Sequence, residues 1–204
     1  MKGLLLKDWY QVSKNMRTMY LTVAIVMAVW LFSTSGSYVF PVSYAAIFLG
    51  ILPVSLLTYD QNSGWVEYGW ALPVSKKLLV AEKYLVGLLC AAGAAGIGGL
   101  FVVVLSLRSG QALDAAALLL LTNSVGTTLL MNGIFLPLMY RFGSEKARMI
   151  YVMMFAGFGA LLAGAADWLQ NTPLWMAAAM LAVVLAVYAA SWRLSVAWYG
   201  KYKK

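Results

Sequence analysis

Hydrophobic residues follow one another in six long runs, and short polar segments separate the runs. The runs cover residues 18–32, 41–59, 84–107, 115–140, 149–166 and 174–192. A helix needs about 20 mainly apolar residues to cross the hydrocarbon core of a bilayer, and only the first run is clearly short of that length. The pattern predicts an all-α integral membrane protein, a single transmembrane domain over residues 1–204 with six transmembrane helices.

The third run carries small residues at its centre. Ala92 and Gly96 lie four positions apart, and so do Ala95 and Gly99. Pairs of small residues at this spacing let helix backbones approach one another closely. We therefore expect other helices to enclose this one.

Residues 1–17 form a different, amphipathic pattern. Apolar side chains recur at helical spacing at Leu5, Trp9, Val12 and Met16, while Lys7, Gln11, Lys14 and Asn15 occupy the other sides. Such a helix lies in the membrane interface, with its apolar face down and its lysines toward anionic headgroups. The alternative is a polar extension of the first span. No small-residue cleavage site follows, so we expect the segment to be retained.

Basic residues are confined almost entirely to four of the segments outside the runs. Of the 15 Lys and Arg residues, only Arg108 lies elsewhere. The four groups are Lys2, Lys7, Lys14 and Arg17; Lys76, Lys77 and Lys83; Arg141, Lys146 and Arg148; and Arg193, Lys201, Lys203 and Lys204. Six spans put all four groups on one side of the membrane, which the positive-inside rule makes cytoplasmic. We therefore expect both termini in the cytoplasm, with residues 193–204 as a basic tail.

The composition narrows the possible functions. The chain is 63% hydrophobic and 11% charged, whereas soluble domains are nearer half apolar and a quarter charged. The net charge of +8 sits at the ends of apolar runs, which argues against a nucleic-acid partner. There is no histidine and Cys90 is the single cysteine, so we expect neither a catalytic centre nor a metal site.

The sequence also lacks the residues that would couple transport to an ion gradient or to ATP hydrolysis. No Asp, Glu, Lys or Arg lies in the middle of a run, which argues against a proton- or sodium-driven carrier. Gly200-Lys201 is followed by Tyr202 and lacks the upstream glycine of a phosphate-binding loop. We therefore expect no cofactor in this chain and no ATP hydrolysis by it. Any uphill transport takes its energy from a partner.

The longest polar interruption, residues 60–83, is the candidate docking element. A short aromatic helix is predicted over residues 64–72, and Pro73 ends it because proline has no amide hydrogen. Trp65 and Trp70 lie inside this loop rather than at a span end. They either float in the headgroup layer or fill a groove on a partner, and the second reading is favoured because tryptophan is common at interface hot spots.

The fourth run is the most polar of the spans. It contains Asn123, Ser124, Thr127, Thr128 and Asn132. Three of these, Ser124, Thr128 and Asn132, form one stripe on a helix because they lie four positions apart. The stripe either makes interhelical hydrogen bonds or lines a translocation path, since polarity alone marks both.

Three sequence patterns resemble one family of membrane proteins. They are Tyr59-Asp60…Ser63-Gly64-Trp65…Leu72-Pro73-Val74-Ser75-Lys76-Lys77…Lys83-Tyr84; Pro137-Leu138-Met139-Tyr140-Arg141-Phe142-Gly143-Ser144-Glu145-Lys146-Ala147-Arg148; and Met1-Lys2-Gly3-Leu4…Lys7-Asp8. Together with the six-span layout they are similar to the small six-helix permeases of type 2 ABC exporters. The likeness is greatest to the branch with the phenol-soluble-modulin exporter permeases of Gram-positive bacteria.

The resemblance implies a permease of the bacterial cell membrane that pairs with a second permease copy, identical or paralogous. Two separate ATP-binding subunits would hold ATP and Mg²⁺. The helix at 64–72 would be a coupling helix that contacts them through Ser63, Gly64, Trp65, Glu67, Tyr68, Trp70, Leu72 and Pro73. A second contact would use Arg141, Phe142, Gly143, Glu145, Lys146 and Arg148. Residues 1–17 would form an elbow helix, and the cargo would be an amphipathic peptide or a hydrophobic small molecule.

Two other functions are weighed against an exporter. One is a non-transporting membrane scaffold or immunity-type protein that binds a cytoplasmic partner. The other is a passive channel, which predicts conductance from the isolated chain. A neighbouring reading frame with a Walker motif favours the exporter.

Overall fold

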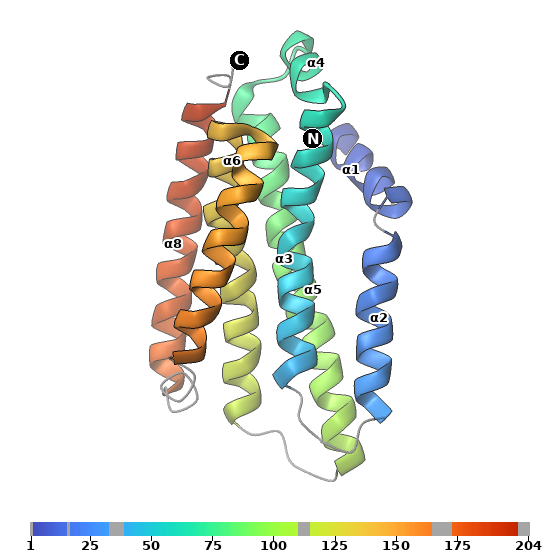
Figure 1. Cartoon of the computed structure of the whole chain (residues 1–204). Helices are drawn as coiled ribbons and strands as arrows, with labels where there is room; N and C mark the ends of the chain where they lie inside the picture. Colours follow the sequence, from blue (N-terminus) through green and yellow to red (C-terminus); the bar gives the residue numbers. More distant parts are fainter. Residues whose placement is uncertain (1, 16, 33–38, 110–114, 165–172, 200–204) are drawn as a thin grey trace.

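The computed structural model describes residues 2–15, 17–32, 39–109, 115–164 and 173–199, with only the backbone described at residues 15, 19, 70, 109, 148, 151–164 and 174. The elements in these ranges are α1 (Lys2–Asn15), α2 (Arg17–Phe32), α3 (Val39–Asn62), α4 (Trp65–Ala71), α5 (Lys76–Ser109), α6 (Ala115–Gly164) and α8 (Leu174–Trp198). Figure 1 shows α2, α3, α5, both arms of α6 and α8 running alongside one another, with α1 and α4 at one end.

The long helices are those expected from the apolar runs. Four described helices are long and apolar enough to cross a membrane, namely Val39–Asn62, Lys76–Arg108, Ala115–Ala147 and Trp175–Trp198. Tyr20–Phe32 in α2 is apolar but shorter. The predicted fifth span, residues 149–166, begins in the second arm of α6, where the backbone is helical to Gly164. The helices fit the predicted all-α membrane protein, and the number of six spans stays a prediction.

Residues 141–148 are a polar segment between two of the predicted runs, which indicates a loop, and the structure differs there. α6 is helical on both sides of a single break at Gly143, which has φ 79° and ψ 171°. Only glycine adopts this conformation readily, so one residue can reverse the chain. The flanking residues include good helix formers such as Glu145 and Ala147, which keeps both sides helical. In Figure 1 the two arms of α6 lie side by side and are antiparallel, because the chain turns back at this bend.

The described parts of the four basic segments meet at one end of the bundle, here called the polar end. The Ser144 hydroxyl donates to Asn62 Oδ1 at 3.3 Å, which joins the α6 bend to the end of α3. The Arg141 guanidinium lies 4.9 Å from the Trp198 ring centroid, which joins the same bend to the end of α8. α1 and α4 lie at this end too (Figure 1). Their common location agrees with the charge distribution, and the assignment of this end to the cytoplasm stays a prediction.

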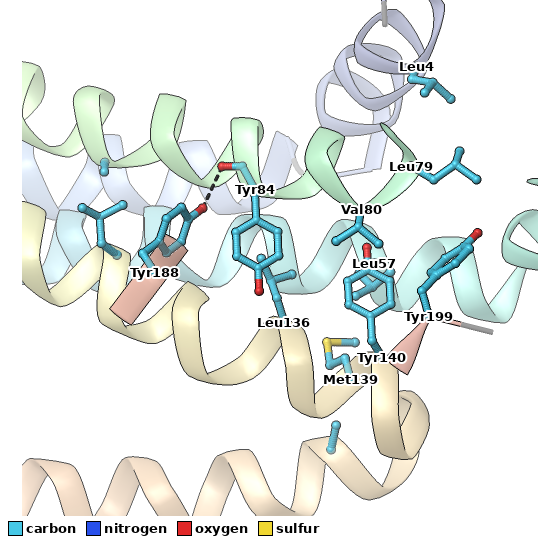
Figure 2. Close-up of a cluster of buried hydrophobic side chains, with 13 residues drawn as sticks. Leu4, Leu57, Leu79, Val80, Tyr84, Leu136, Met139, Tyr140, Tyr188 and Tyr199 are labelled. Atoms are coloured by element: carbon cyan, nitrogen blue, oxygen red, sulfur yellow. Dashed lines mark hydrogen bonds between the residues drawn. The ribbon is translucent and has the colours of Figure 1, made fainter. Parts of the chain in front are cut away.

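The largest buried cluster links α3, α5, α6 and α8 near the polar end (Figure 2). Tyrosine hydroxyls provide its directional contacts. The Tyr84 hydroxyl lies 2.6 Å from the Ser191 hydroxyl and 2.8 Å from the Ser195 hydroxyl, so α5 is bonded to α8. Tyr188 donates to the Tyr84 carbonyl oxygen at 2.7 Å. Polar groups between apolar helices need such partners because lipid offers none.

The small residues of α5 do not all face other helices, as the sequence led us to expect. A side chain at Gly98 would lie 3.0 Å from Leu121 and from Val42, so this position is a close helix contact. Ala92 and Gly96 are instead exposed. The expected enclosure is therefore wrong for the Ala92–Gly96 pair within the described chain, because spacing identifies a smooth face but not its neighbour.

Gly87 and Gly96, both in α5, provide a matched pair for testing the helix packing. A Cβ at Gly87 would lie 2.4 Å from the Tyr188 hydroxyl oxygen, which is held by its bond to Tyr84, whereas a Cβ at Gly96 meets nothing within 4 Å among the described residues. Gly87→Ala should destabilise the detergent-solubilised protein by about 1–3 kcal/mol, the usual range for overpacking. Gly96→Ala should be neutral or stabilise by about 0.5–1 kcal/mol. Equal unfolding midpoints for the two variants would contradict the described α5–α8 contact.

Candidate functional site

α4 is a short helix held between two sharp changes of chain direction. Gly64 precedes it in the left-handed conformation, with φ 73° and ψ 9°, which glycine adopts without strain. The amide of Ser63 donates to the Tyr59 carbonyl at 2.9 Å, which closes the last turn of α3. Leu72 and Pro73 are extended or bent beyond the helix. The sequence predicted a helix over 64–72, and the structure has one over Trp65–Ala71.

The two sides of α4 differ in burial. Trp65 and Val66 are half-buried and pack against the core cluster at the polar end. Glu67 is exposed, and the Tyr68 side chain is 57% exposed. The Trp70 side chain lies outside the described part of the structure. The predicted contact residues thus divide into an anchor, Trp65, and an outward face at Glu67 and Tyr68.

The remaining predicted contact residues flank these two faces. Ser63 and Pro73 are exposed, while Gly64 and Leu72 are half-buried. In the α6 bend the outward side chains are Arg141, Glu145 and Lys146, with Phe142 half-buried and Gly143 buried. The Arg148 side chain lies outside the described residues. The structure therefore brings both predicted contact segments to the same end of the bundle.

α1 is attached to the bundle differently from the predicted interfacial helix. Leu4 belongs to the core cluster, and Leu5 and Val12 pack against a second cluster formed by α3 and α5. Trp9 is exposed, and Met16 lies outside the described residues. The face assigned to the membrane is thus partly covered by protein, because α3 and α5 present apolar side chains at the same level.

Five ionisable side chains form a cluster between α1, α3 and α5. This charge cluster consists of Lys7, Asp8, Asp60, Glu82 and Lys83. The Lys83 ammonium lies 2.7 Å and 2.8 Å from the two Asp8 carboxylate oxygens and 2.7 Å from Asp60 Oδ2. The Lys7 ammonium lies 2.7 Å from both Asp60 carboxylate oxygens. Glu82 Oε1 lies farther from the two ammonium groups, 3.9 Å from that of Lys7 and 3.6 Å from that of Lys83.

The charges of this cluster are mostly removed from solvent. Lys83 is 2% exposed and Asp8 is 2% exposed. Burial by itself raises the pKa of the Asp8 carboxyl, but Lys83 and Lys7 outweigh burial and hold that pKa below its ordinary value. Asp8 is therefore an ionised partner for the lysines. Buried ions of this kind persist only when they are paired.

The sequence did not predict the charge cluster, and the cluster changes the locations predicted for two lysines. Lys7 was placed toward lipid headgroups and Lys83 was counted as a loop charge, yet both pair with carboxylates of distant segments. Counting charges treats each lysine separately, whereas a buried lysine needs a carboxylate in contact with it. The usable signal was local: acidic residues directly follow Lys7 and directly precede Lys83.

The polar stripe of the fourth run faces protein within this chain. Ser124, Thr128 and Asn132 are buried, while Asn123 and Thr127 are half-buried. The Thr128 hydroxyl lies 3.0 Å from the Ala46 carbonyl of α3 and 2.9 Å from the Ser124 carbonyl. Asn132 donates to the Thr128 carbonyl at 2.8 Å. Of these contacts only the one from Thr128 to Ala46 joins two helices, since the other two lie within α6. Burial of the three side chains favours packing against neighbouring helices, and the lining of a translocation path stays a prediction.

A cavity of about 440 Å³ lies between α3 and the two arms of α6 near the polar end. Its lining residues are Ile51, Val54, Ser55, Thr58, Tyr59, Asn62, Phe135, Met139, Ser144, Glu145 and Ala147. Apolar side chains alternate there with hydroxyl and amide groups, and Glu145 adds one carboxylate. This volume falls in the range of small-molecule sites.

The apolar bundle, with its basic segments and exposed short helix at one end, defines a multi-pass membrane protein of the all-helical class. Residues 3–200 match the family described as ABC-2 family transporter protein. The chain belongs to that family and is the membrane permease component of an ABC transporter, whose partner is an ABC ATP-binding subunit. No curated protein and no solved structure matches the chain.

The family confirms the predicted class of ABC-2 type permease, a transport component of the membrane that is not itself catalytic. ATP hydrolysis by a partner subunit stays a prediction. The finer likeness to phenol-soluble-modulin exporters stays a prediction. So do the roles of α4 and of the α6 bend.

Trp65 and Tyr68 test the division of α4 into an anchor and an outward face. Trp65→Ala should lower the free energy of unfolding of the purified chain by about 2 kcal/mol, less than for a fully buried tryptophan. Tyr68→Ala should change it by less than about 0.5 kcal/mol, as at other exposed sites. Thermal unfolding in detergent measures both, and a larger loss at Tyr68 would reverse the assignment.

Thr128→Val tests whether the polar stripe packs or lines a path. The substitution keeps the shape and removes the hydroxyl, so stability should fall by about 0.6 kcal/mol, as for other hydrogen bonds between membrane helices. Transport should stay at the wild-type rate. The half-buried Thr127→Val serves as the comparison. Altered cargo transport with unchanged stability in Thr128→Val would support the path instead.

Proposed function

We propose that this chain is the transmembrane subunit of an ATP-driven exporter in a bacterial cytoplasmic membrane. It moves amphipathic or hydrophobic cargo, a peptide or a drug-like molecule, outward through six spans. ATP and Mg²⁺ are held by two separate ATP-binding subunits, and a second permease copy completes the transporter. The observation that carries this proposal is α4, a preformed helix with one anchored side and one exposed side at the polar end.

α4 acts as the coupling helix through its outward face. Glu67 and Tyr68 offer a carboxylate and an aromatic ring to the ATP-binding subunit, both already exposed. Aromatic side chains at the centre of an interface often dominate its binding energy. Since the other side of α4 packs on the core, a displacement of α4 is transmitted to α3 and α5.

The α6 bend supplies the second contact. The exposed side chains there are Arg141, Glu145 and Lys146, so the bend presents both positive and negative charge. Arg141 is positioned by stacking over Phe142 at 5.1 Å and over Trp198 at 4.9 Å. A planar guanidinium held in this way retains its hydrogen-bond donors for a carboxylate partner.

The cargo class is supported by the walls of the α3–α6 cavity. Ile51, Phe135 and Met139 contribute apolar surface, and Thr58 and Asn62 contribute groups that form hydrogen bonds. Such a mixture suits a molecule with one apolar and one polar side. Among the described residues, Glu145 is the one charged side chain in the lining of this cavity, and the groups of the charge cluster lie outside it. This favours amphipathic cargo over a free inorganic ion.

Two substitutions on the outward face of α4 test this function directly. Glu67→Lys and Tyr68→Ala should each reduce co-purification of the ATP-binding subunit by about tenfold, as expected for interface hot spots. ATP-dependent transport in proteoliposomes should fall in parallel, whereas the unfolding midpoint stays unchanged. Trp175→Ala provides the control, because Trp175 is an exposed aromatic residue in the first turn of α8, and α8 begins at the opposite end of the bundle (Figure 1).

Normal binding of the ATP-binding subunit by both α4 variants would assign docking to another surface. Binding without any ATP-dependent transport by the wild-type complex would favour a non-transporting scaffold. Conductance from the isolated chain in planar bilayers would favour a channel.

A further inference from the structure

The charge cluster lies directly behind the proposed coupling helix. Asp60 is in the last turn of α3, and α4 begins five residues later at Trp65. The Lys7 ammonium lies 4.7 Å from the Trp65 ring centroid while it pairs with Asp60. One lysine of α1 therefore contacts both the end of α3 and the first residue of α4.

We propose that the charge cluster fixes α1 to the base of α4, so that α1, α4 and the first turns of α5 move as one unit during transport. This inference rests on the function proposed above, because it needs a force applied to α4. Lys83 is the central positioning residue of the unit. It joins α5 to α1 through Asp8 and to α3 through Asp60.

Directional ion pairs and apolar contacts together make α1 a fixed part of this unit. Apolar packing alone permits sliding, whereas Lys83 bonds both oxygens of Asp8 at a 2% exposed position. Moving α1 along its axis would leave buried charges without partners, which is strongly unfavourable. Leu4 and Leu5 anchor the same helix in two different apolar clusters. α1 is thereby oriented along its length and around its axis.

The unit continues into the membrane part of the bundle through the next residue of α5. Tyr84 follows Lys83 and bonds the hydroxyls of Ser191 and Ser195 in α8. Its carbonyl also accepts a hydrogen bond from Tyr188. A displacement of the first turns of α5 is therefore passed to α8 by direct bonds. The charge cluster connects α1 and α4 to this same contact.

Lys83→Met tests the unit because it removes the ammonium and keeps most of the side-chain length. Two variants are matched to it: Lys83→Arg, which retains the charge, and Lys77→Met, an exposed lysine in the first turn of the same helix. All are studied in lipid nanodiscs, alone and with the ATP-binding subunit. Amide hydrogen exchange is measured for α1, α4 and α8, before and after trapping with ATP, Mg²⁺ and vanadate.

Without nucleotide, Lys83→Met should speed exchange in α1 by about tenfold or more and leave α8 near the wild-type rate, since a local opening frees α1 alone. On trapping, the wild type should change exchange in α4 and α1 together. Lys83→Met should change it in α4 only. Lys83→Arg and Lys77→Met should follow the wild type.

Unchanged α1 exchange in Lys83→Met, or a joint α4 and α1 response that survives in it, would overturn the proposal. A uniform rise that includes α8 would also overturn it, since it would mean general loss of stability. If α4 of the wild-type complex does not respond to nucleotide at all, the proposed function fails. In that case the nucleotide-free comparison still decides whether the cluster fixes α1.

Discussion

The pairing of Lys83 with Asp8 and Asp60 is the interaction on which the polar end of this permease depends. An ammonium group that is 2% exposed is tolerable only with carboxylates in contact, and these come from two other helices. The lysine therefore fixes where α1 lies and where α3 ends. Because α4 follows α3 after a two-residue turn, the same pairing also sets the position of α4.

Deeper in the bundle the same requirement is met by uncharged groups. Hydroxyls of Tyr84, Thr128 and Tyr188 bond neighbouring helices at carbonyl or serine oxygens. Apolar side chains gain little from meeting each other in lipid, since lipid is equally apolar. Close packing at glycine, as at Gly98, and these few directional bonds select one arrangement of α3, α5, α6 and α8. The polar residues therefore define the helix neighbours.

The helices and the site were predictable to different degrees. Apolar length is a local property, so the long helices and the short helix before Pro73 followed from the sequence. The α6 bend did not, because Arg141 to Arg148 is polar but also favourable for a helix, and only the backbone of Gly143 turns the chain. The ion pairs did not either, since Lys7 and Asp60 are 53 positions apart and Lys83 and Asp8 are 75 apart. The sequence shows that these residues are charged, but only the packing of α1, α3 and α5 shows which of them form pairs.

The shape of α4 is itself a consequence of the bundle. An isolated helix of 7 residues is unstable in water, because helix nucleation costs more than so few hydrogen bonds return. Its helical form is maintained by the left-handed Gly64 at its start and by Trp65 and Val66 packed on the core. A partner that binds Glu67 and Tyr68 therefore meets a surface that is ordered before binding. For the same reason, a partner that displaces α4 also displaces α3. The Asp60 carboxylate, which pairs with Lys7 and Lys83, then moves with α3.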